Sequence, residues 1–451
     1  MHDLSTTLAA VATAPGCGGI GCIRISGPDA YAIAQTLFLT RKGFDFPGDG
    51  RPRFGTFLDG DGQPLDHGYL VVFPPERAFT GECTVELWPH GSPPVLDALT
   101  RAAVARGASL AGPGEFTYRA LRRGRLDLAR AEAVRDLIAA RTVYQARVAF
   151  TQVNGALARH LAPLVEALVE LVARGEAAIE FADESETHLA AGGLAHGLMD
   201  ALASARSLLG EARRGRIVRE GARVALSGVT SVGKSSIFNR LLGRDRAIVS
   251  PVPGTTRDTL EETVDLDGIP VTVIDTAGVR RAGDAIEAEG VRRAQAAASE
   301  ADLVILVLDA GRNLRIDERE ALARRDSRGA GTIVVANKFD LAPPVGGLPW
   351  PGAIPVSALT GEGLDALRAA IREALRGSGP LEDPVLTNVR HAAALEETVA
   401  ALDRARDALP FGEEIVLEDL RAALSALGEI TGEVPNDELY DRIFSTFCIG
   451  K

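Results

Sequence analysis

The segment 228–235 holds the residues whose types and spacing most clearly predict chemistry, because it matches the phosphate-loop pattern G-x-x-x-x-G-K-[ST] in full. Its glycines let backbone N–H groups turn towards phosphate oxygens, and a following helix points its positive N-terminal end at the same anion. Lys234 is expected to reach the β- and γ-phosphates, and Ser235 to offer its hydroxyl to Mg²⁺. The apolar run 223–227 and the helical pattern of 236–242 argue against a chance glycine-rich turn.

A second pattern, Asn337-Lys338-Phe339-Asp340, follows the apolar run 332–336 and is expected to select the base. The Asp340 carboxylate can accept two hydrogen bonds from the N1 and N2 donors of guanine, which adenine does not present. The tripeptide 357–359 fits the backbone support for the guanine O6. Together with the phosphate loop, these elements predict GTP rather than ATP as the nucleotide.

Two further segments are expected to respond to the γ-phosphate. The D-x-x-G element 275–278 follows the second of two predicted strands, which are separated by Asp267-Gly268. In it, Asp275 would hold the metal region and the Gly278 N–H would contact the γ-phosphate. The polar loop from 244 to 258 fits a switch segment in which Thr256 is the second hydroxyl ligand of Mg²⁺.

The catalytic base is not where Ras-like enzymes keep their water-orienting glutamine, because Val279 occupies that position. Glu287 is the best candidate to replace it, and an exposed glutamate at a helix start is the alternative interpretation. We therefore expect catalytic roles for Glu287, Thr256 and Gly278. The predicted nucleotide-binding residues are Gly228, Ser231, Val232, Gly233, Lys234, Ser235, Ser236, Ser250, Thr255, Thr256, Asp275, Thr276, Ala277, Gly278, Asn337, Lys338, Asp340, Ser357, Ala358 and Leu359.

The elements that must position these residues are predicted from changes in composition along the 451-residue chain. Residues 1–118 alternate short apolar runs with Gly and Pro turns, which indicates an α+β domain. Residues 119–217 are rich in Ala, Leu, Arg and Glu with helical spacing, and residues 379–451 resemble them. The GTPase block 218–378 therefore reads as a Ras-like α/β domain inserted into one all-α domain.

The charge and the hydropathy of the sequence limit which partners the protein can bind and where it works. A net charge of −12 argues against a protein that coats nucleic acid indiscriminately, so any contacts with nucleic acid must be local and salt-sensitive. The five arginines between 119 and 130 could form a phosphate-binding patch or a solvated helix face, and both interpretations stay open. No apolar run approaches the length of a membrane span and no basic secretory signal opens the chain, so we expect a cytoplasmic protein.

Nearly the whole chain resembles one family, the tRNA-modification GTPase MnmE, also called TrmE. The segments that carry the resemblance are 15–27, 114–120, 126–133, the switch 254–258 and the ending Cys448-Ile449-Gly450-Lys451. The resemblance implies a homodimer joined through the N-terminal domains. It also implies work with the flavoprotein MnmG, with which the family modifies C5 of the wobble uridine, position 34, in certain tRNAs.

The resemblance further implies a tetrahydrofolate one-carbon donor, either 5,10-methylene- or 5-formyl-tetrahydrofolate. The matching folate positions are Arg24, Glu86, Arg125 and Lys451, and Arg125 stands where relatives have a lysine. Cys448 matches the family's C-terminal cysteine. In the family, the thiol of that cysteine is considered important for the modification. Packing as a small apolar residue is the alternative for Cys448.

In the family, hydrolysis is stimulated when two G domains meet across a K⁺ ion. The matching K⁺ positions are Ser231, Ser250, Val252 and Thr255, but this chain reads Thr230-Ser231 where relatives usually have Pro-Asn. A serine hydroxyl is a shorter and weaker ligand than an asparagine carbonyl. We therefore hypothesise that the K⁺ dependence is weakened or altered while Mg²⁺-dependent GTP binding remains.

Two other functions compete with this interpretation. An Era-like GTPase switch in ribosome assembly shares the G domain, but the chain shows no terminal RNA-binding module with a G-x-x-G loop. A scaffold that binds GTP without turnover is the other alternative, and the intact Asp275, Gly278 and Glu287 speak against it.

Overall fold

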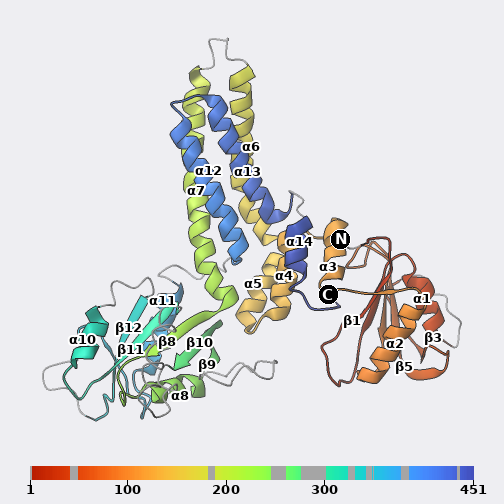
Figure 1. The fold of residues 1–451 in the computed structure, drawn as a ribbon, viewed down its shortest axis with the longest axis horizontal. Helices are drawn as coiled ribbons and strands as arrows, with labels where there is room; N and C mark the ends of the chain where they lie inside the picture. Colours follow the sequence, from red (N-terminus) through yellow and green to blue (C-terminus); the bar gives the residue numbers. More distant parts are fainter. Residues whose placement is uncertain are drawn as a thin grey trace, which may run out of the picture. The chain divides into compact units, whose positions relative to one another are not determined.

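The computed structural model describes residues 3–40, 49–180, 188–244, 261–275, 301–323, 331–341, 348, 350–376, 385–433 and 437–450. The chain divides into two compact units, one made of residues 1–135 and 428–451 and the other of residues 136–427. Figure 1 shows the ribbon with its elements labelled. Each unit is described by itself.

The first unit is built on a seven-stranded sheet in the order β3-β4-β5-β6-β2-β1-β7. Neighbouring strands are antiparallel except β1 and β7, which are parallel. The strands are β1 (Leu8–Val11), β2 (Ile23–Ser26), β3 (Phe38–Leu39), β4 (Arg53–Leu58), β5 (Pro64–Phe73), β6 (Thr84–Trp88) and β7 (Ser109–Leu110).

Helices α1 (Ala30–Leu37) and α2 (Pro93–Ala105) share a core with this sheet. The buried side chains of Leu37 and Leu99 pack with strand residues such as Ile25. A second cluster joins α3 (Glu115–Arg122), α4 (Leu128–Ala139) and α14 (Asp437–Phe444) through apolar and aromatic contacts. The mixed strands and helices confirm the predicted α+β character of the N-terminal region.

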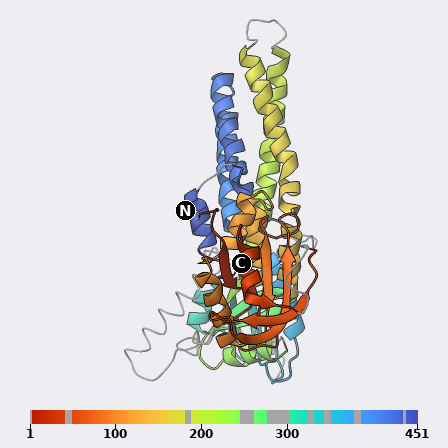
Figure 2. The ribbon, with the colours of Figure 1, turned by 90° about the vertical axis from the view of Figure 1, so that its right-hand side faces the viewer.

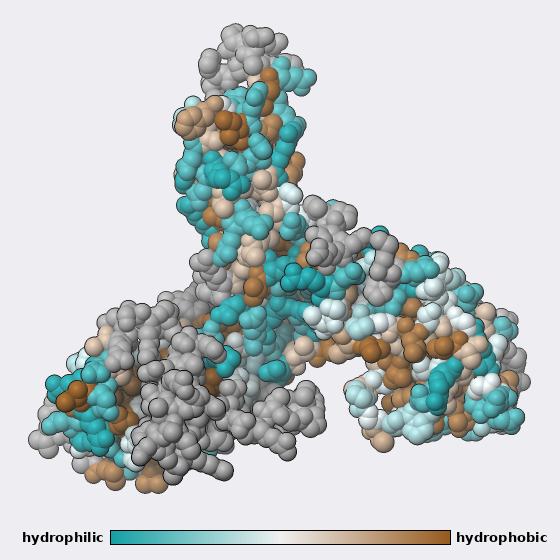
Figure 3. Space-filling view, in the orientation of Figure 1, coloured by the Kyte–Doolittle hydropathy of each residue, from teal (hydrophilic) through white to brown (hydrophobic). Residues whose placement is uncertain are grey.

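The second unit contains a bundle of long helices (Figure 1, Figure 2). Helix α7 packs along both α6 and α12. These helices are α5 (Val143–Val153), α6 (Ala156–Glu180), α7 (His188–Glu220), α12 (Val389–Ala408) and α13 (Glu413–Thr431). Because α7 precedes the G domain and α12 follows it, their packing confirms that the α/β domain is inserted into a helical domain. The bundle surface visible in Figure 3 is mostly hydrophilic, as solvent-facing helices require.

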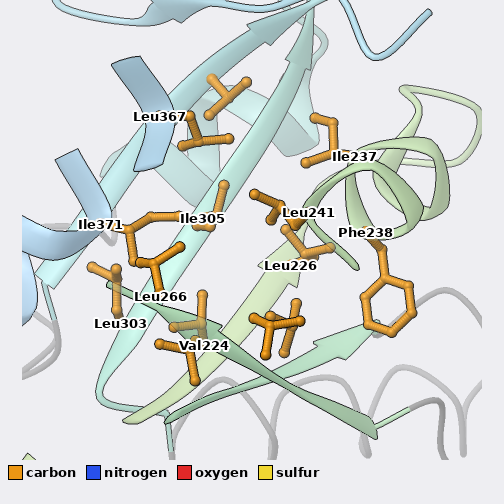
Figure 4. Packing of buried hydrophobic residues seen from close by; sticks show 14 of the residues in the cluster. Val224, Leu226, Ile237, Phe238, Leu241, Leu266, Leu303, Ile305, Leu367 and Ile371 are labelled. Carbon is orange, nitrogen blue, oxygen red and sulfur yellow. The ribbon is translucent and has the colours of Figure 1, made fainter. Parts of the chain in front are cut away.

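The inserted domain holds a six-stranded sheet in the order β13-β12-β11-β8-β10-β9, parallel except for β9. Figure 4 shows its core, where Leu226 and Ile305 from the strands face Ile237 and Leu367 from the helices. The strands are β8 (Ala222–Ser227), β9 (Glu261–Leu266), β10 (Ile269–Asp275), β11 (Leu303–Asp309), β12 (Gly331–Asn337) and β13 (Ile354–Pro355). The helices are α8 (Lys234–Arg244), α10 (Ile316–Ala323) and α11 (Leu364–Arg376).

The β9–β10 hairpin turns at Asp267 and Gly268, whose φ angles of 51° and 93° are those of a two-residue hairpin turn with both central residues left-handed. This confirms the two predicted strands and their turn. None of the described helices is both long and apolar enough to span a membrane.

Candidate functional site

The phosphate loop runs from the end of β8 to the start of α8, as its sequence predicts. Gly228 has φ 145°, and a Cβ there would lie 2.4 Å from the Val307 carbonyl oxygen. Gly233 has φ 95°, and a Cβ there would lie 2.2 Å from Asn337 Nδ2. Both positions therefore require glycine, because the backbone approaches its neighbours too closely for any side chain.

The lysine of the loop is folded onto the loop itself. Lys234 Nζ donates to the carbonyl oxygens of Gly228 (2.8 Å) and Val229 (2.9 Å), and the residue is only 6% exposed. Ser235 and Ser236 follow it in the first turn of α8. The ammonium group thus lies at the helix N-terminus, where a phosphate would meet it together with the helix dipole.

Ser231 has the left-handed φ of 66°, a conformation that residues other than glycine adopt rarely and asparagine tolerates better than serine. Serine at this position therefore differs from asparagine in its backbone preference as well as in its side-chain oxygen.

Asn337, the last residue of β12, joins the two halves of the predicted nucleotide site. Its Nδ2 donates to the Val232 carbonyl oxygen (2.8 Å), and its Oδ1 accepts from the Ala358 N–H (3.0 Å). The residue is 2% exposed, so both bonds are shielded from water. The phosphate loop and the 357–359 loop are therefore held together by one side chain.

Asp340, the predicted guanine-selecting residue, is oriented by a serine. Ser357 Oγ donates to Asp340 Oδ1 (2.6 Å) and accepts from the Thr360 N–H (3.0 Å), while Ser357 itself is fully buried. Leu359 exposes 73% of its surface.

Lys338 pairs with Asp309, an acidic residue that the sequence motifs do not include. Lys338 has a left-handed φ of 67°, and its Nζ lies 2.8 Å from Oδ2 of Asp309, at the end of β11. Burial alone would raise the pKa of Asp309, but hydrogen bonds from Lys338 and the Gly311 N–H, with the charge of Lys338, lower it below its usual value. The signal for Asp309 was its place directly after an apolar strand, at the carboxyl end of a parallel sheet.

Arg240 on α8 is the second residue that the sequence did not reveal. It donates through Nε to the Ala358 carbonyl oxygen (2.9 Å) and through Nη2 to the carbonyl oxygen of Leu359.

In the predicted D-x-x-G element 275–278, Asp275 is the residue whose backbone the structure describes. Asp275 ends β10 and pairs in register with Leu226 of β8, so its backbone lies beside the strand that leads into the phosphate loop. The predicted residues outside the described ranges are Ser250, Val252, Thr255, Thr256, Thr276, Ala277, Gly278, Glu287 and Lys451.

In the first unit, two of the predicted folate residues face each other across β2 and β6. Arg24 and Glu86 are register partners, and Arg24 Nη2 lies 2.8 Å from Glu86 Oε1. Arg24 Nη1 also donates to the Gly450 carbonyl oxygen (3.4 Å), and Trp88 Nε1 donates to Glu86 Oε2 (3.1 Å). The structure therefore joins this ion pair to the end of the chain.

The chain end is fixed beside β1. Ile449 forms an isolated bridge with Pro113, and the Gly114 N–H donates to the carbonyl oxygen of Cys448 (3.3 Å). The Cys448 residue is exposed. Arg125, by contrast, is anchored on another turn, where its Nη2 donates to the carbonyl oxygens of Glu76 (2.6 Å) and Ala78 (3.3 Å).

Neither interpretation of the arginines at 119–130 holds for Arg119, which is fully buried. Its Nη1 donates to Glu82 Oε2 (3.1 Å) and to the Thr6 carbonyl oxygen (2.6 Å), and Arg123 binds the other oxygen of Glu82. The charge of Arg119 is used inside the unit, which a helical pattern of exposed arginines does not reveal.

Within the ranges that the structure describes, no cluster of three or more His, Cys, Asp or Glu residues is arranged to hold a metal ion. Cys22, which lies near Glu86, is a poor nucleophile: burial, and then the Glu86 charge, raise the pKa of its thiol to about 12.

Family models match both parts of the chain. The model of the MnmE helical domain matches residues 128–448, and the model of the N-terminus of the GTP-binding protein TrmE matches residues 7–125. Curated proteins named tRNA modification GTPase MnmE are similar over the full length. The protein of Roseiflexus castenholzii is 41% identical and that of Xanthomonas campestris pv. campestris 42% identical, each over 100% of both chains.

A solved structure of Aquifex aeolicus Era bound to GDP.AlF4- covers 40% of this chain and 66% of its own, at 27% identity and a TM-score of 0.29. That score is too low to relate the two whole chains.

The fold and the site define a multidomain GTPase, in which an α+β domain is followed along the chain by a helical domain with a P-loop domain inserted into it. With its full-length relatives and both domain models matched, the chain belongs to the MnmE family and is an enzyme of the GTPase class.

Proposed function

We propose that this GTPase serves the C5 modification of the wobble uridine, position 34, in tRNA. It does so with the flavoprotein MnmG and with 5,10-methylene- or 5-formyl-tetrahydrofolate as one-carbon donor. The full-length similarity to proteins named tRNA modification GTPases supports the pathway. The observation that carries the GTP part is the Asn337 side chain, which binds both the phosphate loop and the 357–359 loop.

The chain's own residues fit a guanine nucleotide with Mg²⁺. The positions of Gly228 and Gly233 leave no room for a side chain, and Lys234 places its charge on the same loop. Ser235 and Thr256 would hold Mg²⁺, which supplies charge neutralisation at the phosphates when bound. The Gly278 N–H would contact the γ-phosphate, and Glu287 would orient the attacking water. The hydrogen bond from Ser357 orients the Asp340 carboxylate.

For the folate, Arg24 and Glu86 offer a guanidinium and a carboxylate beside the chain end, and a folate presents both carboxylates and ring N–H groups. Lys451 and Arg125 complete the proposed set, and Cys448 is the proposed thiol. We further propose a homodimer joined through the N-terminal domains, with tRNA and MnmG as partners, that works in the cytoplasm.

GTP hydrolysis is proposed to drive the meeting and rearrangement of two G domains across a K⁺ ion held by Ser231, Ser250, Val252 and Thr255. The proposed domains are residues 1–118, 119–217, 218–378 and 379–451.

Reconstitution tests this function. The purified protein, MnmG, unmodified tRNA, GTP, 5,10-methylene-tetrahydrofolate and an amine donor, either glycine or ammonium, are combined, and the nucleosides are analysed by mass spectrometry. We expect a modified uridine with the parent, none with Lys234→Ala, and retained GTP hydrolysis but no modification with Arg24→Ala. GTP hydrolysis without any uridine product from the parent would contradict the proposal and favour the Era-like alternative.

A further inference from the structure

Arg240 connects the helix of the phosphate loop to the 357–359 loop. It lies on α8, six residues after Lys234, which is fewer than two helical turns. Its guanidinium donates through Nε to the carbonyl oxygen of Ala358 (2.9 Å) and through Nη2 to that of Leu359. Two successive carbonyl groups of the 357–359 loop are therefore bound by one side chain.

The backbone of Ala358 is held on both sides of its Cα. Its N–H donates to Asn337 Oδ1 (3.0 Å), while its carbonyl oxygen accepts from Arg240. Asn337 approaches from the end of β12 and Arg240 from α8, so two elements fix this loop independently. Loss of Arg240 removes both bonds that tie the loop to α8, while the bonds of Asn337 and Ser357 remain.

The chemistry of the contact requires an arginine. A guanidinium is a rigid planar fork whose N–H groups can bind two neighbouring acceptors at once, whereas a lysine ammonium acts as a single point charge on a flexible stem. Hydrogen bonds from a charged group are also stronger than those between neutral groups. Arg240 thus holds the loop in one arrangement rather than merely attracting it.

We propose that Arg240 is a positioning residue for guanine recognition, which sets the 357–359 loop against the O6 edge of the base and ties that loop to the phosphate-loop helix. This inference rests on the proposed nucleotide site. Arg240 acts through the loop, so its loss should weaken recognition of O6 more than binding of the phosphates.

A pair of nucleotides isolates this effect. GDP presents O6, whereas 6-thio-GDP keeps the N1 and N2 donors and the phosphates but offers sulfur, a weak acceptor, in place of O6. The dissociation constants of both are measured for the full-length parent, Arg240→Ala and Arg240→Lys. Arg372→Ala is the matched control, because Arg372 is a surface arginine on α11 of the same domain and pairs with the exposed Asp267.

We expect Arg240→Ala to weaken GDP binding about tenfold, the worth of hydrogen bonds to a charged group. Binding of 6-thio-GDP should change little, so the preference for GDP over 6-thio-GDP should fall. Arg240→Lys should lie between the parent and Arg240→Ala, and it carries the test if the alanine variant does not fold.

Equal weakening of both nucleotides, unchanged binding of both, or the same loss in Arg372→Ala would each overturn the inference. A parent that does not bind GDP would instead overturn the proposed nucleotide site, so the two failures are distinguishable.

Discussion

At the scale of single residues, the buried ion pair of Glu82 and Arg119 is expected to matter for the stability of the first unit. Their side chains are 4% and 0% exposed, and Glu82 also binds Arg123. Removing the Glu82 charge leaves the buried Arg119 with only the more distant carboxylate of Glu115, at 3.8 Å, so we expect Glu82→Gln to cost about 3 kcal/mol. The double variant Glu82→Leu with Arg119→Met should recover most of that loss.

The unfolding of the full chain is measured by calorimetry. GDP is expected to bind the G domain, so the transition that GDP does not shift is taken as the unfolding of the first unit. Arg101→Ala is the control, because Arg101 and Asp97 form an ion pair whose side chains are 74% and 60% exposed, and such pairs contribute under about 1 kcal/mol. A loss in Glu82→Gln no larger than in Arg101→Ala would show that the buried pair is not needed.

Asp309 makes the stability of the G domain sensitive to acid. Its pKa in the folded state lies below the usual value, so the folded carboxylate stays ionised to a lower pH than the unfolded one. The resulting stabilisation is fully present above roughly pH 4 and is lost as the pH falls through the lower, folded pKa. We expect the unfolding temperature of the GDP-sensitive transition to fall less between neutral pH and pH 3 in Asp309→Asn than in the parent. Parallel curves for the two proteins would refute this.

At the scale of elements, α5 contacts the hairpin that leads to the D-x-x-G segment. Thr142 caps α5 with Gln145 in a capping box, and its Oγ1 donates to the Gly268 carbonyl oxygen (2.6 Å). A Cβ on Gly268, at φ 93°, would lie 2.5 Å from Tyr144 Cβ. The turn therefore needs glycine for its conformation and for this contact.

We expect Gly268→Ala to destabilise the G domain by about 3 kcal/mol, because left-handed strain and overpacking add. Gly352→Ala is the matched control: Gly352 has φ 80° and open space where its Cβ would be, so strain alone should cost about 1 kcal/mol. The unfolding temperature of the GDP-sensitive transition measures both. Equal losses would mean that Tyr144 moves aside at little cost.

The sequence predicted those parts of the fold and site that depend on local pattern. The strand, loop and helix around Lys234, and the strand that ends at Asn337, follow from residue types within a few positions. The contacts of Arg240 with Ala358 and of Arg119 with Glu82 join residues 118 and 37 positions apart. Such pairs depend on how elements pack, and a single sequence with charged residues in helical patterns does not contain that information.

At the scale of the whole molecule, Ser231 bears on the proposed contact between the G domains of two copies of the chain. The proposed meeting of G domains across K⁺ needs oxygen ligands, and Ser231 offers a hydroxyl on a backbone with φ 66°. Asparagine supplies a longer carbonyl ligand and tolerates this conformation better. Ser231→Asn should therefore improve both the cation site and the backbone that forms it.

We expect GTP hydrolysis by the parent to differ little between KCl and NaCl at equal ionic strength, and Ser231→Asn to gain selective stimulation by K⁺. The unfolding temperature without nucleotide should rise slightly or stay the same, since the backbone strain is relieved. Thr230→Pro alone is the control, because it changes the neighbouring residue without adding an oxygen ligand. Strong, selective K⁺ stimulation of the parent would show that backbone oxygens or water suffice at this site and that Ser231 is no weakness.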